Sequence, residues 1–96
     1  MSQAPEDVRT IIEHGVAQWA AAKREGTLSA VLEALYDHEI NVGLQSFWDG
    51  GWTVWIGDDM NGHLAELGVE RDEFHRITPW LIDVAERRFP ALLGNR

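Results

Sequence analysis

The sequence predicts an α+β domain, a two-layer sandwich in the order helix, helix, strand, strand, strand, helix. The three strands are expected to form an antiparallel meander with the helices on one face. Two changes of period carry this prediction: helical spacing of apolar residues gives way to alternation at Ile40, and helical spacing returns after Arg71. The 96 residues suit a single domain, 1–96, with one modest core.

Two helices are predicted before the strands. The first covers 5–25, because acidic residues occupy its first turn, basic residues occupy its last turn, and apolar residues recur at helical spacing, namely Val8, Ile11, Ile12, Val16, Trp19 and Ala20. Gly26 is expected to end this helix. Thr27 is placed to cap a second helix that ends near Asp37 or His38 and has its own apolar stripe, Leu28, Val31, Leu32 and Leu35.

Alternating apolar residues from Ile40 predict the meander. A three-residue loop at 49–51 would pair Trp48 with Trp52 on the core face and Leu44 with Ile56. A two-residue turn at Asn61-Gly62 would pair Ile56 with Leu67. This register gives one consistent apolar face, formed by Leu44, Val54, Ile56 and Leu67, with the Ser46 hydroxyl buried on the same side.

The final helix is expected to begin with Thr78 as its cap and Pro79 at its first position, after a turn at 72–76, and to end at Phe89-Pro90. Its buried stripe would be Ile77, Leu81, Val84 and Ala85. The first and last helices are expected to cover the apolar face of the sheet, with Trp19 and Trp80 in that interface.

The opposite face of the predicted sheet supplies the candidate binding residues, which are Asn41, Gln45, Phe47, Thr53, Trp55, Glu66 and Glu70. The register places Trp55 near the centre of this face, puts Gly43 opposite Gly57, and puts Gly68 opposite Trp55. An aromatic pair, Phe47 and Trp55, beside bare backbone is typical of a protein-binding patch. Two alternatives stay open: the second helix packs on this face, or the aromatic rings only cover the glycine backbone.

Charge separates the sequence into regions. The net charge is −8, and residues 27–70 contain eight carboxylates and no lysine or arginine. Such a surface repels phosphate backbones, so we expect no nucleic-acid partner. It either keeps the protein soluble or attracts a basic protein or a cation. Short apolar runs and an N-terminus without a leader pattern predict a cytoplasmic protein with no membrane contact, and the absence of cysteine suits a reducing compartment.

The sequence offers no recognisable catalytic constellation. No two of its four histidines have the spacing of a metal site, and on a regular strand His63 and Glu66 would point to opposite faces. Ser46 lacks the glycine-flanked elbow of hydrolases, and no phosphate-binding glycine loop opens a helix. We therefore predict no catalytic residue, no metal and no cofactor.

The sequence thus favours a small acidic, non-enzymatic protein-binding or regulatory module. Its partner would be another protein or a second copy of the chain, which would form a homodimer through the open sheet face. The alternative is a small-molecule-binding protein or a minimal enzyme with a pocket around Trp55, lined by Asn41, Gln45 and Glu66.

Overall fold

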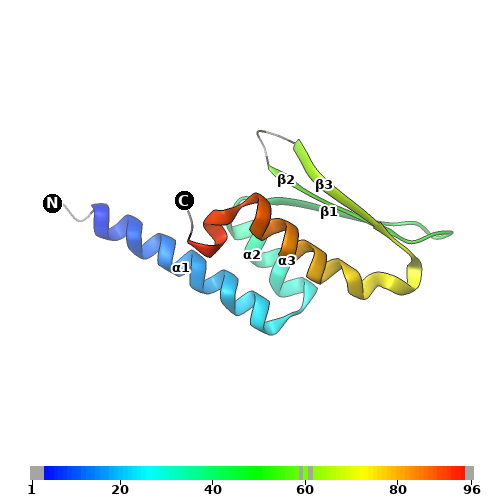
Figure 1. Cartoon of the computed structure of the whole chain (residues 1–96), viewed down its shortest axis with the longest axis horizontal. Coiled ribbons are helices and arrows are strands. Elements are labelled where there is room, and N and C mark those ends of the chain that lie inside the picture. The colour runs from blue at the N-terminus through cyan, green and yellow to red at the C-terminus, as the bar shows by residue number, and fades with distance from the viewer. Residues whose placement is uncertain (1–3, 59, 61, 95–96) are drawn as a thin grey trace.

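The computed structural model describes residues 4–58, 60 and 62–94. It confirms the predicted α+β order and the three-stranded antiparallel sheet, whose strand order is β1-β2-β3 (Figure 1). The elements are α1 (Ala4–Glu25), α2 (Leu28–Asp37), β1 (Asn41–Ser46), β2 (Trp52–Asp58), β3 (Gly62–Val69), the 3-10 helix η1 (Arg71–Arg76), α3 (Ile77–Arg88) and the 3-10 helix η2 (Pro90–Leu93).

The connection between the first two helices forms as predicted. Gly26 adopts a φ of +74°, a conformation that glycine reaches without a side-chain clash, and its N–H donates to the Ala22 carbonyl at 3.0 Å. Thr27 then caps α2, since its side-chain oxygen accepts a hydrogen bond from the Ala30 N–H at 3.1 Å. The two-residue connection therefore folds α2 back against α1.

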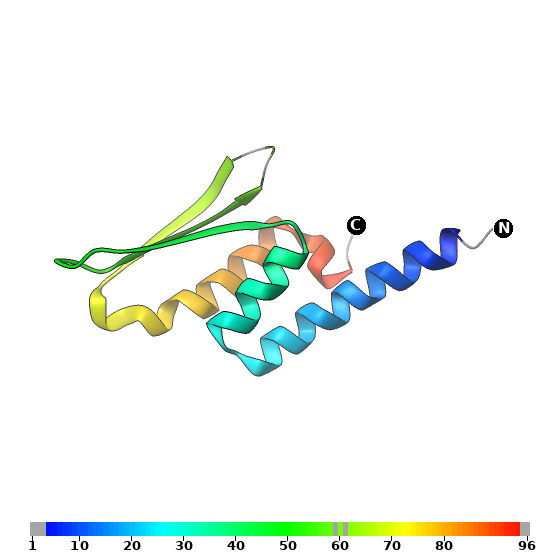
Figure 2. The ribbon, with the colours of Figure 1, turned by 180° about the vertical axis from the view of Figure 1, so that it is seen from behind.

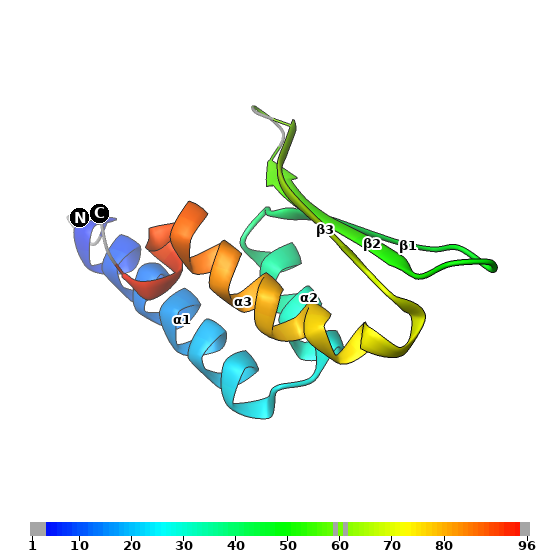
Figure 3. The ribbon, with the colours of Figure 1, turned by 45° about the vertical axis from the view of Figure 1, so that its right-hand side comes forward.

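The helices lie on one side of the sheet, but the pair next to the strands differs from the predicted pair. Contacts with the strands come from α2, η1 and α3, while α1 packs against α2 and η2 on the outer side of this layer (Figure 3). The cause is local, because α2 passes directly into β1 through Glu39, whose φ is +62°. One core joins the layers, and its largest fully buried members include Trp19, Leu35, Ile56, Ile77 and Leu81.

Trp19 is buried, as predicted, although it faces α3 rather than the sheet. Its indole Nε1 donates to Glu86 Oε2 at 2.9 Å, and Lys23 Nζ lies 2.5 Å from the same oxygen. Burial alone would raise the pKa of Glu86, but these hydrogen bonds from Lys23 and Trp19 outweigh burial and lower it. The interaction links α1 to α3. Trp80 is half-buried against the core.

The β1–β2 register differs from the predicted one by two residues. Leu44 lies opposite Val54 and Ser46 opposite Trp52, so the predicted Trp48–Trp52 and Leu44–Ile56 pairs are wrong. The turn comprises 48–50, because the Phe47 N–H donates to the Gly51 carbonyl at 3.0 Å. Gly51 belongs to the paired region, where any Cβ would lie 1.8 Å from the Val69 carbonyl oxygen. A shift of two preserves which residues share a face.

The β2–β3 register also shifts by two, and it contains a bulge. Val54 lies opposite Leu67 and Ile56 opposite Ala65, so the predicted Ile56–Leu67 pair is wrong. Between Ile56 and Gly57 the register changes, and Gly57 pairs with His63. A Cβ on Gly57 would lie 1.8 Å from the Gly62 carbonyl oxygen, which explains glycine at this close approach.

The second predicted turn falls partly on Asn61, which lies outside the described residues. The glycine of this predicted turn belongs to a strand instead. Gly62 starts β3 with a φ of +70° and pairs with Asp58. The Asp58 carboxylate instead accepts a hydrogen bond from the Met60 N–H at 2.9 Å, an arrangement typical of aspartate in turns.

The last helix begins earlier than predicted. η1 runs directly into α3, which starts at Ile77, so Thr78 is not the cap and Pro79 is the third residue, where its missing N–H leaves no helical bond unmade. Glu70 caps η1 instead, and the Glu73 carboxylate accepts a hydrogen bond from the Glu70 N–H at 3.0 Å. The predicted buried stripe and the end at Phe89 are confirmed.

Candidate functional site

The sheet face opposite the helices is the first candidate surface. None of the described helices packs on this face (Figure 3). The alternative in which the second helix covers it is therefore wrong. Trp55 lies on this face with Gly43 and Glu66 as its cross-strand neighbours. Its ring stacks on His63, with centroids 3.8 Å apart and planes inclined by 18°. The resulting Trp55–His63 stack forms the aromatic centre of the face.

Gly43 allows the indole to lie flat across the edge strand. A Cβ on Gly43 would lie 1.9 Å from Trp55 Nε1, so the ring occupies the space where a side chain would stand. The predicted pairs of Gly43 with Gly57 and of Gly68 with Trp55 are wrong, because Gly68 lies opposite Thr53. The Trp55 indole of the same chain therefore explains why glycine stands at position 43.

The structure brings some of the predicted binding residues together. Gln45 pairs with Thr53, and Glu66 pairs with Trp55, so these four share one patch, while Asn41 lies at the far end of the strand opposite Gly57. The other two lie apart: Phe47 pairs with Gly51 between the end of β1 and the turn, and Glu70 caps η1 beyond the end of β3. Phe47 and Trp55 are therefore not an aromatic pair.

The bulge in β3 has a consequence that the sequence pattern did not reveal. His63 pairs with Gly57 and Glu66 with Trp55, and these two β2 residues point to the same face. His63 and Glu66 are thus on one face, whereas regular alternation predicted opposite faces. Within the described residues, no group of three or more histidine or carboxylate side chains could hold a metal ion.

The edge strand β1 is the second candidate surface, and it carries no charge. The segment from Ile40 to Trp48 contains no charged residue and no proline, although such residues usually protect sheet edges. Leu44 is 39% exposed, and Trp48 at the turn is 94% exposed. Ser46 is also exposed, at the end of the edge strand next to the turn, so the prediction of a buried hydroxyl is wrong.

A groove of about 390 Å³ follows the first half of β1. Its lining comes from α2 on one side and from the strand and the indole on the other, namely Leu32, Tyr36, Ile40, Asn41, Val42 and Trp55. The alternative pocket predicted around Trp55 shares Trp55 and Asn41 with this groove, but Gln45 and Glu66 do not line it. Tyr36 is 80% exposed and stands at the rim.

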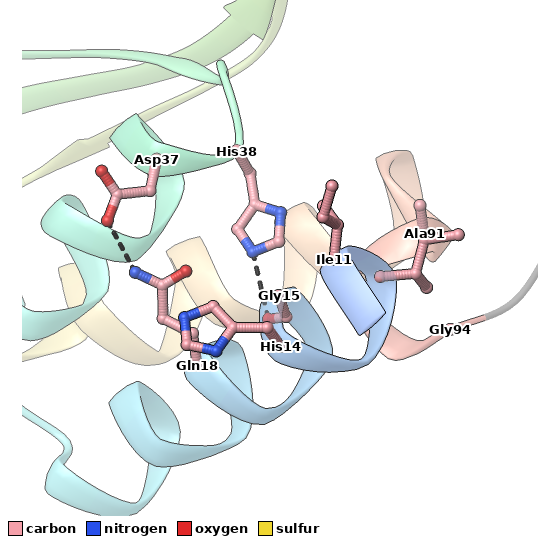
Figure 4. Close-up of a pocket in the computed structure, with 9 residues that line it drawn as sticks. Ile11, His14, Gly15, Gln18, Asp37, His38, Ala91 and Gly94 are labelled. Carbon is pink, nitrogen blue, oxygen red and sulfur yellow. Dashed lines mark hydrogen bonds between the residues drawn. The ribbon is translucent and has the colours of Figure 1, made fainter. Parts of the chain in front are cut away.

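A larger hollow, of about 760 Å³, lies away from the sheet between α1, the end of α2 and η2 (Figure 4). No local sequence pattern indicates this hollow, because its polar residues come from segments far apart in the chain: His14, Gln18, Asp37 and His38. Two hydrogen bonds hold its wall. Gln18 Nε2 donates to Asp37 Oδ2 at 2.6 Å, and His38 Nε2 lies 3.2 Å from the Gly15 carbonyl oxygen.

Comparisons with known proteins add no relative: no family model, curated protein or solved structure matches the chain. A search of the described helices for one long and apolar enough to cross a membrane found none.

Proposed function

We propose that this chain is a protein-binding module that accepts an extended segment of a partner protein as an added strand on β1. The observation that carries the proposal is the uncharged, exposed edge strand in a chain whose net charge is −8. In strand addition, the partner's backbone pairs with the free edge, and pockets beside the edge select its alternate side chains.

The groove beside β1 supports this mode of binding. Side chains of an added strand alternate between the two faces of the sheet. Those on the open face would meet Trp55, and those on the helix side would meet Tyr36 and Leu32, all three of which line the groove. Aromatic side chains at both faces supply contact area of the kind that dominates binding energy in protein interfaces.

The charge around the edge favours a basic partner. Glu39 precedes β1, Asp49 lies in the turn after it, and Glu66 stands on the open face opposite Trp55. A second copy paired along β1 would bring the same carboxylates against each other, which opposes association. A segment with apolar residues in the middle and lysine or arginine at both ends complements both the uncharged edge strand and the carboxylates around it.

The proposal is tested with a short synthetic peptide in which valine and threonine alternate between terminal lysines. We expect its titration to shift the backbone NMR signals of β1 and to leave those of α1 in place. Two matched peptides separate the contribution of backbone pairing from that of charge. In the first, N-methylation of alternate backbone amides removes the hydrogen bonds of strand pairing. In the second, glutamate replaces the terminal lysines and reverses the charge. Equal binding of the N-methylated peptide would overturn strand addition.

Two variants of the protein locate the binding surface. Tyr36 and Met60 are 80% and 90% exposed, so replacing either by alanine removes little buried area. Tyr36→Ala should weaken peptide binding, whereas Met60→Ala should leave it unchanged. Sedimentation of the free protein tests the homodimer: a dimer that protects the β1 amides from exchange would assign the edge to a second copy and contradict the basic partner.

A further inference from the structure

The hollow between α1, α2 and η2 has the size of a small-molecule site. Its volume of about 760 Å³ falls within the range of roughly 300–1,000 Å³ that ligand pockets occupy. Its wall combines apolar side chains with a few polar groups, as such pockets generally do. Ile11, Ile12 and Ala91 supply the apolar part, and the polar part comes from α1 and the end of α2.

The position of His38 shows that this wall is built by a specific contact. Gly15 lies in the middle of α1, where glycine is less favourable than alanine. A Cβ at this position would lie 2.9 Å from His38 Cε1, so glycine lets the imidazole rest against the backbone of α1. The same contact aligns His38 Nε2 with the Gly15 carbonyl oxygen.

This hydrogen bond determines what the imidazole offers to a ligand. The Gly15 carbonyl can only accept, so His38 Nε2 carries the proton and donates it. In the neutral ring the other nitrogen, Nδ1, is then an acceptor. In Figure 4 this nitrogen points toward Ile11, on the side of the ring away from the bond to Gly15.

The remaining charge in the pocket is negative. The Asp37 carboxylate accepts one hydrogen bond, from Gln18, and lies at the end of α2, where the helix dipole is negative and no basic residue occupies the last turn. Among the described residues that line the hollow there is no lysine or arginine. Acceptors and negative charge beside an apolar wall complement a ligand with N–H donors, positive charge and an apolar body.

We infer that this hollow binds a small organic cation, with an ammonium group at Asp37 and its apolar body against Ile11 and Ile12. Ile11 is 70% exposed, so a ligand there would cover apolar surface that the described chain leaves open. The site is separate from the β1 edge and does not depend on the proposed protein partner.

The test uses benzylamine as the probe, with benzyl alcohol and benzoate as neutral and anionic matches. We expect saturable NMR shifts of the Gly15, His38 and Gly94 amides with benzylamine, weaker binding of the alcohol, and none of benzoate. An affinity on the order of millimolar suits so small a probe. The β1 amides should not move, which keeps this outcome distinct from the peptide experiment.

Two charge-neutralising variants locate the recognition. Asp37→Asn should weaken benzylamine binding about threefold to fivefold, the usual scale for one exposed ion pair. Glu33→Gln, which removes an exposed charge from the same helix outside the hollow, should leave the affinity unchanged. Equal effects of both variants, equal affinity for amine and alcohol, or no shift at Gly15 and His38 would each overturn the inference.

Discussion

Replacing Ile56 and Leu44 by alanine, one at a time, separates the covered part of the sheet from its exposed part. Both residues point to the helix side of the sheet, but Ile56 is fully buried beneath the helices and Leu44 is 39% exposed. Truncating a buried isoleucine costs about 2–5 kcal/mol, because transfer and cavity terms add. For Ile56→Ala we expect the upper half of that range.

The expected cost of Leu44→Ala is smaller and follows from its exposure. Complete burial of a leucine side chain is worth about 1.5–3 kcal/mol. About three-fifths of the residue is buried, and the space left by truncation opens to water rather than forming a cavity. We therefore expect a loss of about 1 kcal/mol.

Urea unfolding followed by far-ultraviolet circular dichroism measures both costs, and a domain of this size is expected to unfold in one step. The denaturation midpoint should fall several times further for Ile56→Ala than for Leu44→Ala. Equal losses for the two variants would mean that the helices cover the whole apolar face, and the placement of the β1 edge outside the core would then be wrong.

Three further predictions address other contacts. Gly43→Ala should displace the Trp55 indole, because the new Cβ would lie 1.9 Å from Nε1; a shift of the Trp55 indole N–H signal and of the His63 ring signals tests this. Thr27→Ala should lower the free energy of unfolding by about 1 kcal/mol, the usual value of a lost helix cap, and an unchanged urea midpoint would contradict it. The pKa of Glu86 is lower in the folded state than in the unfolded state, so its ionised carboxylate stabilises the fold above the unfolded-state pKa, and this contribution is lost as pH falls through the folded-state pKa. In Glu86→Gln the free energy of unfolding, measured by urea melts, should therefore fall less steeply on the acid side.

The sequence predicted which residues share a face of the sheet more reliably than which residues pair. Side chains alternate with a period of two, so a shift of the register by two residues leaves Val54 and Leu67 on the same face. The predicted apolar face is therefore still correct. The register itself depends on backbone contacts between neighbouring strands. The approaches of Gly51 to Val69 and of Gly57 to Gly62 belong to those contacts, and they are visible only after the strands are placed side by side.

Helix placement was harder to predict for a related reason. The apolar stripe of α1 suggests a helix buried along its length, yet Ile11 is exposed and the first turns of α1 project past the rest of the chain (Figure 2). A stripe reports only that a helix packs on one side. Whether its neighbour is the sheet or another helix depends on the connections, and here the bend at Glu39 brings α2 to the strands.

The candidate sites show the same limit. Alternation alone placed four of the candidate residues on one face, and they do share a patch, namely Gln45, Thr53, Trp55 and Glu66. The stack of Trp55 on His63 needed the bulge at Gly57, which the pattern does not encode. The hollow at His38 joins residues 23 positions apart across α1 and α2, so no local spacing could have indicated it.

The most direct test of strand addition at β1 is an isotope-filtered NOE spectrum of labelled protein bound to the unlabelled lysine-ended peptide. If the peptide adds to the sheet at β1, its backbone should show intermolecular contacts with residues 41–46, and its side chains should lie alternately close to the Trp55 and Tyr36 rings. Contacts confined to β3 or to the helices, with none to β1, would contradict the claim that the uncharged edge strand is the binding surface.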